Sequence, residues 1–112
     1  MKTQVYNKLI RDNIPEIIKE SGKHPETIKV QGTELFKYLK SKLQEELLEY
    51  MESEDVEELA DMVEVIYSIL YHNGISKDEF KRVITDKRAI RGSFEEGYIL
   101  LRVTEDEDED MD

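Results

Sequence analysis

The sequence predicts an all-α domain built around an antiparallel helical hairpin, with a small two-stranded β addition. Three observations support this prediction. Apolar residues recur at spacings of three and four along two neighbouring segments, as they do on one face of an amphipathic helix. Residues that begin or end helices separate these segments. Two acidic pairs with i, i+3 spacing, Glu46/Glu49 and Glu58/Asp61, lie twelve residues apart, one on each segment.

The first elements are short. Pro15 in a first turn and Gly22 just past an end predict a helix over residues 14–21, with Asn13 or Ile14 near its cap. Residues 27–32, TIKVQG, alternate and are rich in β-branched side chains, so they are expected to form a strand ending at Gly32.

Three long helices are expected to follow. Thr33 is expected to cap the first, over residues 34–52. Ser53 to Asp55 open the second, which stops at Asn73-Gly74. Ser76 opens the third, which runs to about Ile90. The apolar stripe of the first is Phe36, Leu39, Leu43, Leu47 and Tyr50, and that of the second is Val56, Leu59, Val63, Ile66 and Leu70. Residues 98–103, YILLRV, are expected to form the second strand.

Composition limits the protein to one domain. The chain has 112 residues, of which 38% are hydrophobic, and a net charge of −11. Residues 105–112 contain seven acids and no base, so they are expected to form a disordered acidic tail after a domain at 1–104. This charge argues against nucleic-acid binding. The absence of cysteine, of a signal-like stretch and of a membrane span predicts a cytoplasmic protein.

The acidic pairs are the main functional signal. On a helix, two carboxylates at i, i+3 stand about one turn apart on the same side. If the two helices are antiparallel neighbours, four carboxylates converge, and a hard divalent cation would offset their repulsion. On the second helix the pair shares a partly apolar face with Met62, Val65 and Ile69, whereas Glu45 on the first helix is expected to point away from the stripe. The alternative is a solvated acidic face without a ligand.

The order of these residues resembles a known family. Glu45-Glu46-x-x-Glu49 followed by Glu58-x-x-Asp61 resembles the EExxE…ExxD signature of the MazG-like, all-α nucleotide pyrophosphohydrolases, which include dimeric dUTPases and phosphoribosyl-ATP pyrophosphohydrolase. The opening VYNKLIRDNIPEII and the closing KRAIRGSFEEGYILL resemble the flanks of one MazG-like branch. The resemblance implies a bundle of the MazG-like type in which Glu46, Glu49, Glu58 and Asp61 hold Mg²⁺, with Mn²⁺ as a substitute.

The resemblance also implies an activity: hydrolysis of a nucleoside triphosphate to the monophosphate and pyrophosphate. Glu45 or Glu46, whichever is not engaged with metal, would accept the proton of the attacking water. The remaining phosphate charge requires cations, and two clusters offer them, Lys8 with Arg11 and Lys87 with Arg88 and Arg91.

The sequence therefore predicts a Mg²⁺-dependent nucleoside triphosphate pyrophosphohydrolase acting in nucleotide-pool house-cleaning. The alternatives are hydrolysis of phosphoribosyl-ATP in histidine biosynthesis and a non-catalytic helical interaction module. The apolar residues on two sides of the 56–70 segment predict a homodimer or homotetramer.

Overall fold

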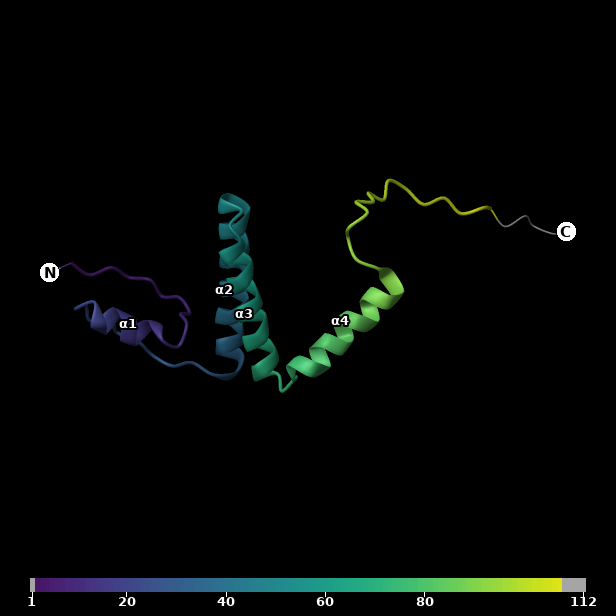
Figure 1. Ribbon diagram of the computed structural model, residues 1–112. Helices are drawn as coiled ribbons and strands as arrows, with labels where there is room; N and C mark the ends of the chain where they lie inside the picture. The colour runs from purple at the N-terminus through teal and green to yellow at the C-terminus, as the bar shows by residue number, and fades with distance from the viewer. Residues whose placement is uncertain (1, 108–112) are drawn as a thin grey trace. The chain divides into compact units, whose positions relative to one another are not determined.

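The computed structural model describes residues 2–107 and contains four helices in that range (Figure 1). They are α1 (Ile14–Glu20), α2 (Gly32–Ser53), α3 (Val56–His72) and α4 (Lys77–Arg91). The predicted all-α class is confirmed. The chain divides into two compact units, Met1–Phe80 and Lys81–Asp112, and each is described by itself.

The centre of the first unit is the hairpin of α2 and α3, which lie side by side (Figure 1). A two-residue turn reverses the chain. Glu54 adopts the left-handed conformation at the end of α2, with φ 56°, and its backbone N–H donates to the Tyr50 carbonyl at 2.7 Å. Asp55 caps α3, since its side chain accepts from the Glu57 N–H at 3.2 Å. The short turn makes the two helices antiparallel, as predicted.

The hairpin core is small, and on α3 it draws on both apolar faces rather than on the main stripe alone. Val65, from the second and partly apolar face, is only 9% exposed, and Leu70 of the predicted main stripe is 8% exposed, whereas Val56 and Leu59 of that stripe are 72% and 41% exposed. Leu39 of α2 completes the set of buried apolar residues in the described range. Both faces of α3 carry apolar residues, so periodicity alone could not show which of them are buried.

The helix ends agree with the sequence to within about two residues, with one correction. Thr33 is not the cap of α2. The helix begins at Gly32 after Gln31, because the Leu35 N–H already bonds to the Gln31 carbonyl at 3.5 Å. At α4, Ser76 caps as predicted, with its hydroxyl accepting from the Glu79 N–H at 3.1 Å.

The expected β addition is absent from residues 2–107. Residues 27–31 and 98–103, the two segments expected to be strands, have no regular secondary structure. A short strand is stable only when it pairs with another, and neither segment has a strand partner among the described residues. None of the helices in this part of the chain combines the length and apolar composition needed to cross a membrane.

The second unit holds most of α4 and the non-helical residues after it. Many of its large apolar side chains are exposed: Val83, Ile84, Ile90, Phe94, Tyr98, Ile99, Leu100, Leu101 and Val103. Residues 105–107 of the expected acidic tail are exposed and non-helical, and residues 108–112 lie outside the described range.

Candidate metal centre on the helical hairpin

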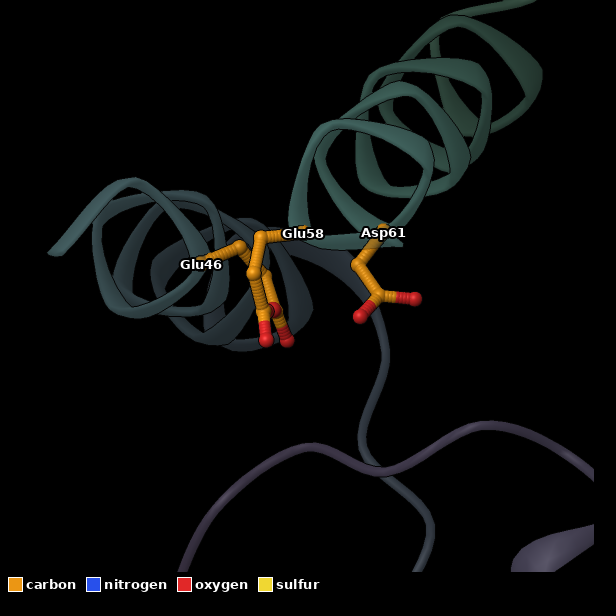
Figure 2. Close-up of side chains that lie close together, drawn as sticks. All are labelled: Glu46, Glu58 and Asp61. Atoms are coloured by element: carbon orange, nitrogen blue, oxygen red, sulfur yellow. The ribbon is translucent and has the colours of Figure 1, made fainter. Parts of the chain in front are cut away.

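Three acids from the two helices of the hairpin meet at one place. Carboxylate oxygens of Glu46 on α2 and of Glu58 and Asp61 on α3 all lie within 4.8 Å of one another. Figure 2 shows the Glu46 and Glu58 side chains running together from the two helices, with Asp61 beside them. This acidic cluster contains three of the four metal ligands that the sequence predicted.

Burial makes this cluster unlike an ordinary acidic surface. Glu46 is only 6% exposed, and its Oε2 atom has no hydrogen-bond partner. The Oε2 atom of Glu58 is buried and unpartnered as well. A buried carboxylate oxygen without a partner is costly, because it has lost water and gained nothing in return. Two such atoms in one cluster make it a candidate cation site.

The spacing suits a small divalent cation. Carboxylate oxygens on opposite sides of a Mg²⁺ ion stand roughly 4 Å apart, which is twice the usual bond length. The 4.8 Å limit of the cluster is close to that span, so small side-chain shifts would close it on one ion. An all-carboxylate set also has the hard oxygen chemistry that Mg²⁺ and Mn²⁺ prefer over softer metals.

Glu49, the fourth predicted ligand, lies at the rim of the cluster. It is exposed and falls outside the group of three oxygens. The pKa of Glu58 is raised to about 7, first because the carboxylate of Glu49 can share its proton, and then by burial and by the carboxylate of Glu46. The pKa of Glu46 is also raised, chiefly by burial. A cation bound here would compete with these protons.

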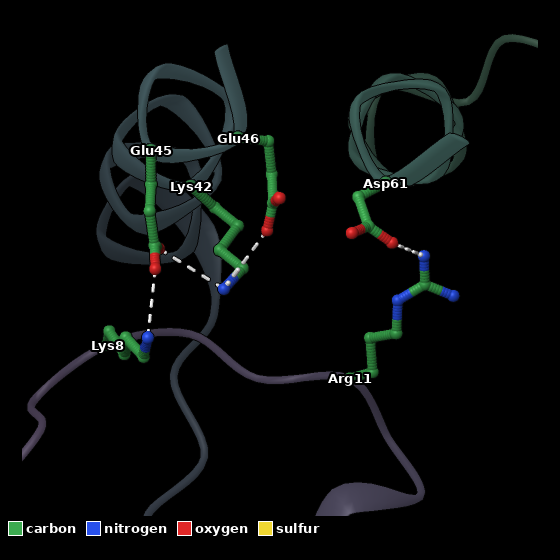
Figure 3. Close-up of polar contacts among 6 residues, drawn as sticks. All are labelled: Lys8, Arg11, Lys42, Glu45, Glu46 and Asp61. Carbon is green, nitrogen blue, oxygen red and sulfur yellow. Dashed lines mark hydrogen bonds and ion pairs between the residues drawn. The ribbon is translucent and has the colours of Figure 1, made fainter. Parts of the chain in front are cut away.

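Glu45 has a different environment and does not point to the solvated side as expected. It is half-buried because residues of the N-terminal segment lie against it (Figure 3). Its Oε1 atom accepts from Lys8 Nζ at 2.9 Å, and its Oε2 atom accepts from Lys42 Nζ at 3.2 Å. The pKa of Glu45 is lowered, first by the hydrogen bond from Lys8. Glu45 is therefore a fully paired carboxylate.

Arg11 contacts the acidic cluster directly. Its guanidinium donates to Asp61 Oδ1 at 2.7 Å across fifty residues of sequence (Figure 3). Together with the Lys8–Glu45 pair, this contact ties the segment before α1 to both helices of the hairpin. The structure thus brings the first of the two predicted basic clusters to the acids. Lys87, Arg88 and Arg91 of the second cluster are exposed at the end of α4.

Lys42 is the site residue that the sequence did not single out. Its side chain is 17% exposed, and its ammonium bridges Glu45 at 3.2 Å and Glu46 Oε1 at 3.5 Å. The available signal was its i, i+3 and i, i+4 spacing to these two acids, which favours ion pairs on a helix. Lys42 partly neutralises the cluster but leaves Glu46 Oε2 unpartnered.

Comparison with protein-family models, with curated proteins and with solved structures finds no match for this chain.

The raised pKa of Glu58 predicts an unusual pH dependence of stability without metal. Between its ordinary value of 4.5 and about 7, the folded protein binds more protons at Glu58 than the unfolded chain does. Stability should therefore fall as pH rises through this window. In chelator, the melting temperature should decrease from about pH 5 to about pH 7.5, and Glu58→Gln should flatten the decrease.

Glu45 does not obscure this measurement. Its pKa is lowered from 4.5, so its contribution to stability is present above that value and is lost only at lower pH. A melting temperature that rises steadily from about pH 5 to about pH 7.5 in chelator would contradict the close packing of Glu58 against Glu49 and Glu46.

Proposed function

We propose that this protein is a Mg²⁺-dependent nucleoside triphosphate pyrophosphohydrolase of the MazG-like type. The observation that carries the proposal is the acidic cluster of Glu46, Glu58 and Asp61, with two buried oxygens that lack a partner. These residues occupy the positions that the EExxE…ExxD resemblance marks as metal ligands. A metal-binding carboxylate cluster at those positions is what this reaction requires.

Glu46, Glu58 and Asp61 would hold the metal. Glu49, whose carboxylate raises the pKa of Glu58, would orient that carboxylate, as partners of ligating groups commonly do. When bound, Mg²⁺ supplies charge neutralisation for the polyphosphate and for the pyrophosphate that leaves. The protein residues must then place water and substrate and accept a proton.

Glu46 is the better base of the two candidates. Both oxygens of Glu45 already accept from lysines, and its lowered pKa makes it a weak proton acceptor. Glu46 can serve both roles only if one of its oxygens binds the metal and the other accepts the proton, and without metal burial raises its pKa, which makes it more basic than Glu45. Water would attack the α-phosphorus, the α–β bridging P–O bond would break towards pyrophosphate, and the water proton would pass to Glu46.

Arg11 and Lys8 are proposed to contact phosphate at the edge of the cluster. Both are partly exposed and hold their cationic groups beside the acids, at Asp61 and Glu45 respectively. A polyphosphate bound there presents anionic oxygens, as the carboxylates of Asp61 and Glu45 do, but it carries more charge. The planar guanidinium of Arg11 can bind two of these oxygens. Lys87, Arg88 and Arg91 of α4 are proposed to contribute further phosphate contacts.

The products test this proposal. A panel of nucleoside triphosphates, with phosphoribosyl-ATP included, is incubated with the protein in Mg²⁺ or in chelator and then separated by ion-exchange chromatography. We expect nucleoside monophosphate and pyrophosphate from at least one substrate, and no turnover in chelator. Diphosphate with orthophosphate as first products would exclude attack at the α-phosphorus, and no turnover of any substrate would favour the interaction module.

The protein is also proposed to work as a homo-oligomer. Only three apolar side chains are buried in residues 2–107, too few for a stable domain of this size. The hairpin exposes Leu47 and Met51 of α2 and Val56, Leu59 and Val63 of α3. A second copy exposes the same apolar residues, so a symmetric contact would cover both sets.

Light scattering after size exclusion should give a mass of twice or four times 13.2 kDa. Replacing Leu59 and Val63 by glutamate should lower that mass, because the two charges would be buried in the contact. Glutamate at Val5, which is exposed on the N-terminal segment, is the matched control and should not change it. A wild-type mass of one chain at micromolar concentration would contradict the oligomer.

A further inference from the structure

A small pocket lies between the N-terminal segment and α2, next to the acidic cluster. Its volume is about 120 Å³, and its walls are Asn7, Lys8 and Leu9 on one side and Tyr38, Ser41, Lys42 and Glu45 on the other. Tyr38 and Ser41 also line a second pocket, together with Thr33, Glu34 and Lys37 at the start of α2. Glu45 in the wall of the first pocket adjoins Glu46 of the cluster in the chain.

The charged residues of this pocket are already paired. Lys8 and Lys42 both contact Glu45, at 2.9 Å and 3.2 Å, and Lys42 also contacts Glu46 at 3.5 Å. The two cations of the wall are therefore held by Glu45 in the wall and by Glu46 beside it. A phosphate group can reach Lys8 only by displacing Glu45, so the space between the walls is left to an uncharged part of the ligand.

The groups that remain available are neutral. Among residues 2–107, the side chains of Asn7, Tyr38 and Ser41 form no hydrogen bond within the protein. An amide and a hydroxyl can donate and accept at the edge of a heterocycle, and the tyrosine ring can stack on its face. Leu9 adds an apolar surface. This combination fits an uncharged heteroaromatic ring.

The size of the pocket favours the same ligand. Pockets for whole drug-sized molecules measure roughly 300–1,000 Å³, so about 120 Å³ accommodates a single ring system rather than a complete nucleotide.

We propose that this pocket binds the nucleobase of the substrate, with Tyr38 as the stacking residue and Asn7 as a residue that reads the base edge. The inference rests on the proposed function, because it assumes that the phosphates lie at the acidic cluster. Lys42 links the two places, since it touches Glu45 in the pocket wall and Glu46 in the cluster. A nucleotide bound in this way has its base between the N-terminal segment and α2.

Binding measurements separate the contribution of the base to the affinity from that of the phosphates. Isothermal titration of the full chain in Mg²⁺ compares α,β-methylene nucleoside triphosphates of several bases, which resist hydrolysis, with inorganic tripolyphosphate. Wild type should bind the preferred nucleotide analogue at least about tenfold more tightly than tripolyphosphate, in line with the stabilisation that one base–aromatic stack provides. Tyr38→Ala should abolish this difference, whereas Tyr38→Phe should retain it.

Two further variants complete the design. Tyr71→Ala removes an exposed tyrosine of α3 that lines neither pocket, and it should leave both affinities unchanged. Asn7→Ala removes the amide of an exposed loop residue, and it should narrow the differences in affinity among analogues with different bases. Circular dichroism checks the helix content of every variant.

The outcomes distinguish the two proposals. If wild type binds tripolyphosphate and all nucleotide analogues equally, or if Tyr38→Ala weakens them all by the same factor while Asn7→Ala leaves the base preference intact, the pocket does not hold the base, although the proposed function stands. If wild type binds neither analogue nor tripolyphosphate in Mg²⁺, the proposed function fails and this inference fails with it.

Discussion

Glu46→Gln should lower turnover at least about a hundredfold while leaving the helical fold intact. Glu46 is 6% exposed and supplies a carboxylate to the acidic cluster, where its Oε2 atom has no other partner. Glutamine has the same shape but no negative charge, so it is a poorer metal ligand and cannot accept the proton of water. The measurement is steady-state hydrolysis at saturating Mg²⁺, on the best substrate of the panel.

The same substitution should not destabilise the protein in chelator. The pKa of Glu46 is raised by burial, which means that its charged form is unfavourable in the folded state. A neutral side chain removes this cost, so the melting temperature should stay equal or increase. Glu64→Gln on the exposed side of α3 is the matched control and should keep full activity. Full activity in Glu46→Gln would remove this residue from the mechanism.

Asp61→Asn should abolish the stabilisation that Mg²⁺ or Mn²⁺ gives the wild-type protein. A ligand that binds only the folded state stabilises it by about 2.7 kcal/mol at a hundred times its dissociation constant, which corresponds to a rise in melting temperature on the order of 10 °C for a domain of this size. Asparagine removes one of three carboxylates from the cluster. Thermal denaturation with and without the cation measures the difference.

Arg11→Gln is the control for this experiment, because Asp61→Asn also breaks the 2.7 Å contact between Arg11 and Asp61. That pair is partly exposed and contributes about 0–1 kcal/mol. Arg11→Gln should therefore retain the cation-induced rise, which Asp61→Asn should lose. Equal cation-induced stabilisation in wild type and Asp61→Asn would show that the cation binds elsewhere.

Local chemistry made the helices and their ends predictable from the sequence. Asp55 and Ser76 have the capping groups that a helix start requires, and both act as caps in the structure. The acidic pairs were also predictable as neighbours, since a two-residue turn makes α2 and α3 antiparallel. Side chains of neighbouring helices can then reach one another, and carboxylate oxygens of Glu46 and Glu58 lie within 4.8 Å of one another.

The contacts of the N-terminal segment were not predictable in the same way. Lys8 and Arg11 reach acids that are 37 and 50 residues away, through a segment without helical periodicity. The sequence marked both residues as cations available to phosphate, but only the tertiary structure pairs them with Glu45 and Asp61. The exposed position expected for Glu45 was wrong for this reason, because helical geometry takes no account of a segment that covers the helix.

The two strands predicted at residues 27–32 and 98–103 do not form, for a related reason. Residues 98–103 have the composition of a strand, but β propensity depends on pairing and burial, and Leu100 in this segment is 80% exposed. Which residues of the two apolar faces of α3 are buried depended equally on its packing partner, which local sequence does not specify.

The location of the bound cation is the most direct test of the proposed metal centre. Crystals grown with Mn²⁺ and measured near the manganese absorption edge should show an anomalous peak bounded by Glu46, Glu58 and Asp61, with carboxylate oxygens roughly 2.0–2.6 Å from it. A peak at these three side chains is the predicted result. A fully occupied peak elsewhere, with the three carboxylates free of metal, would contradict the central claim that this cluster is the metal centre of the protein.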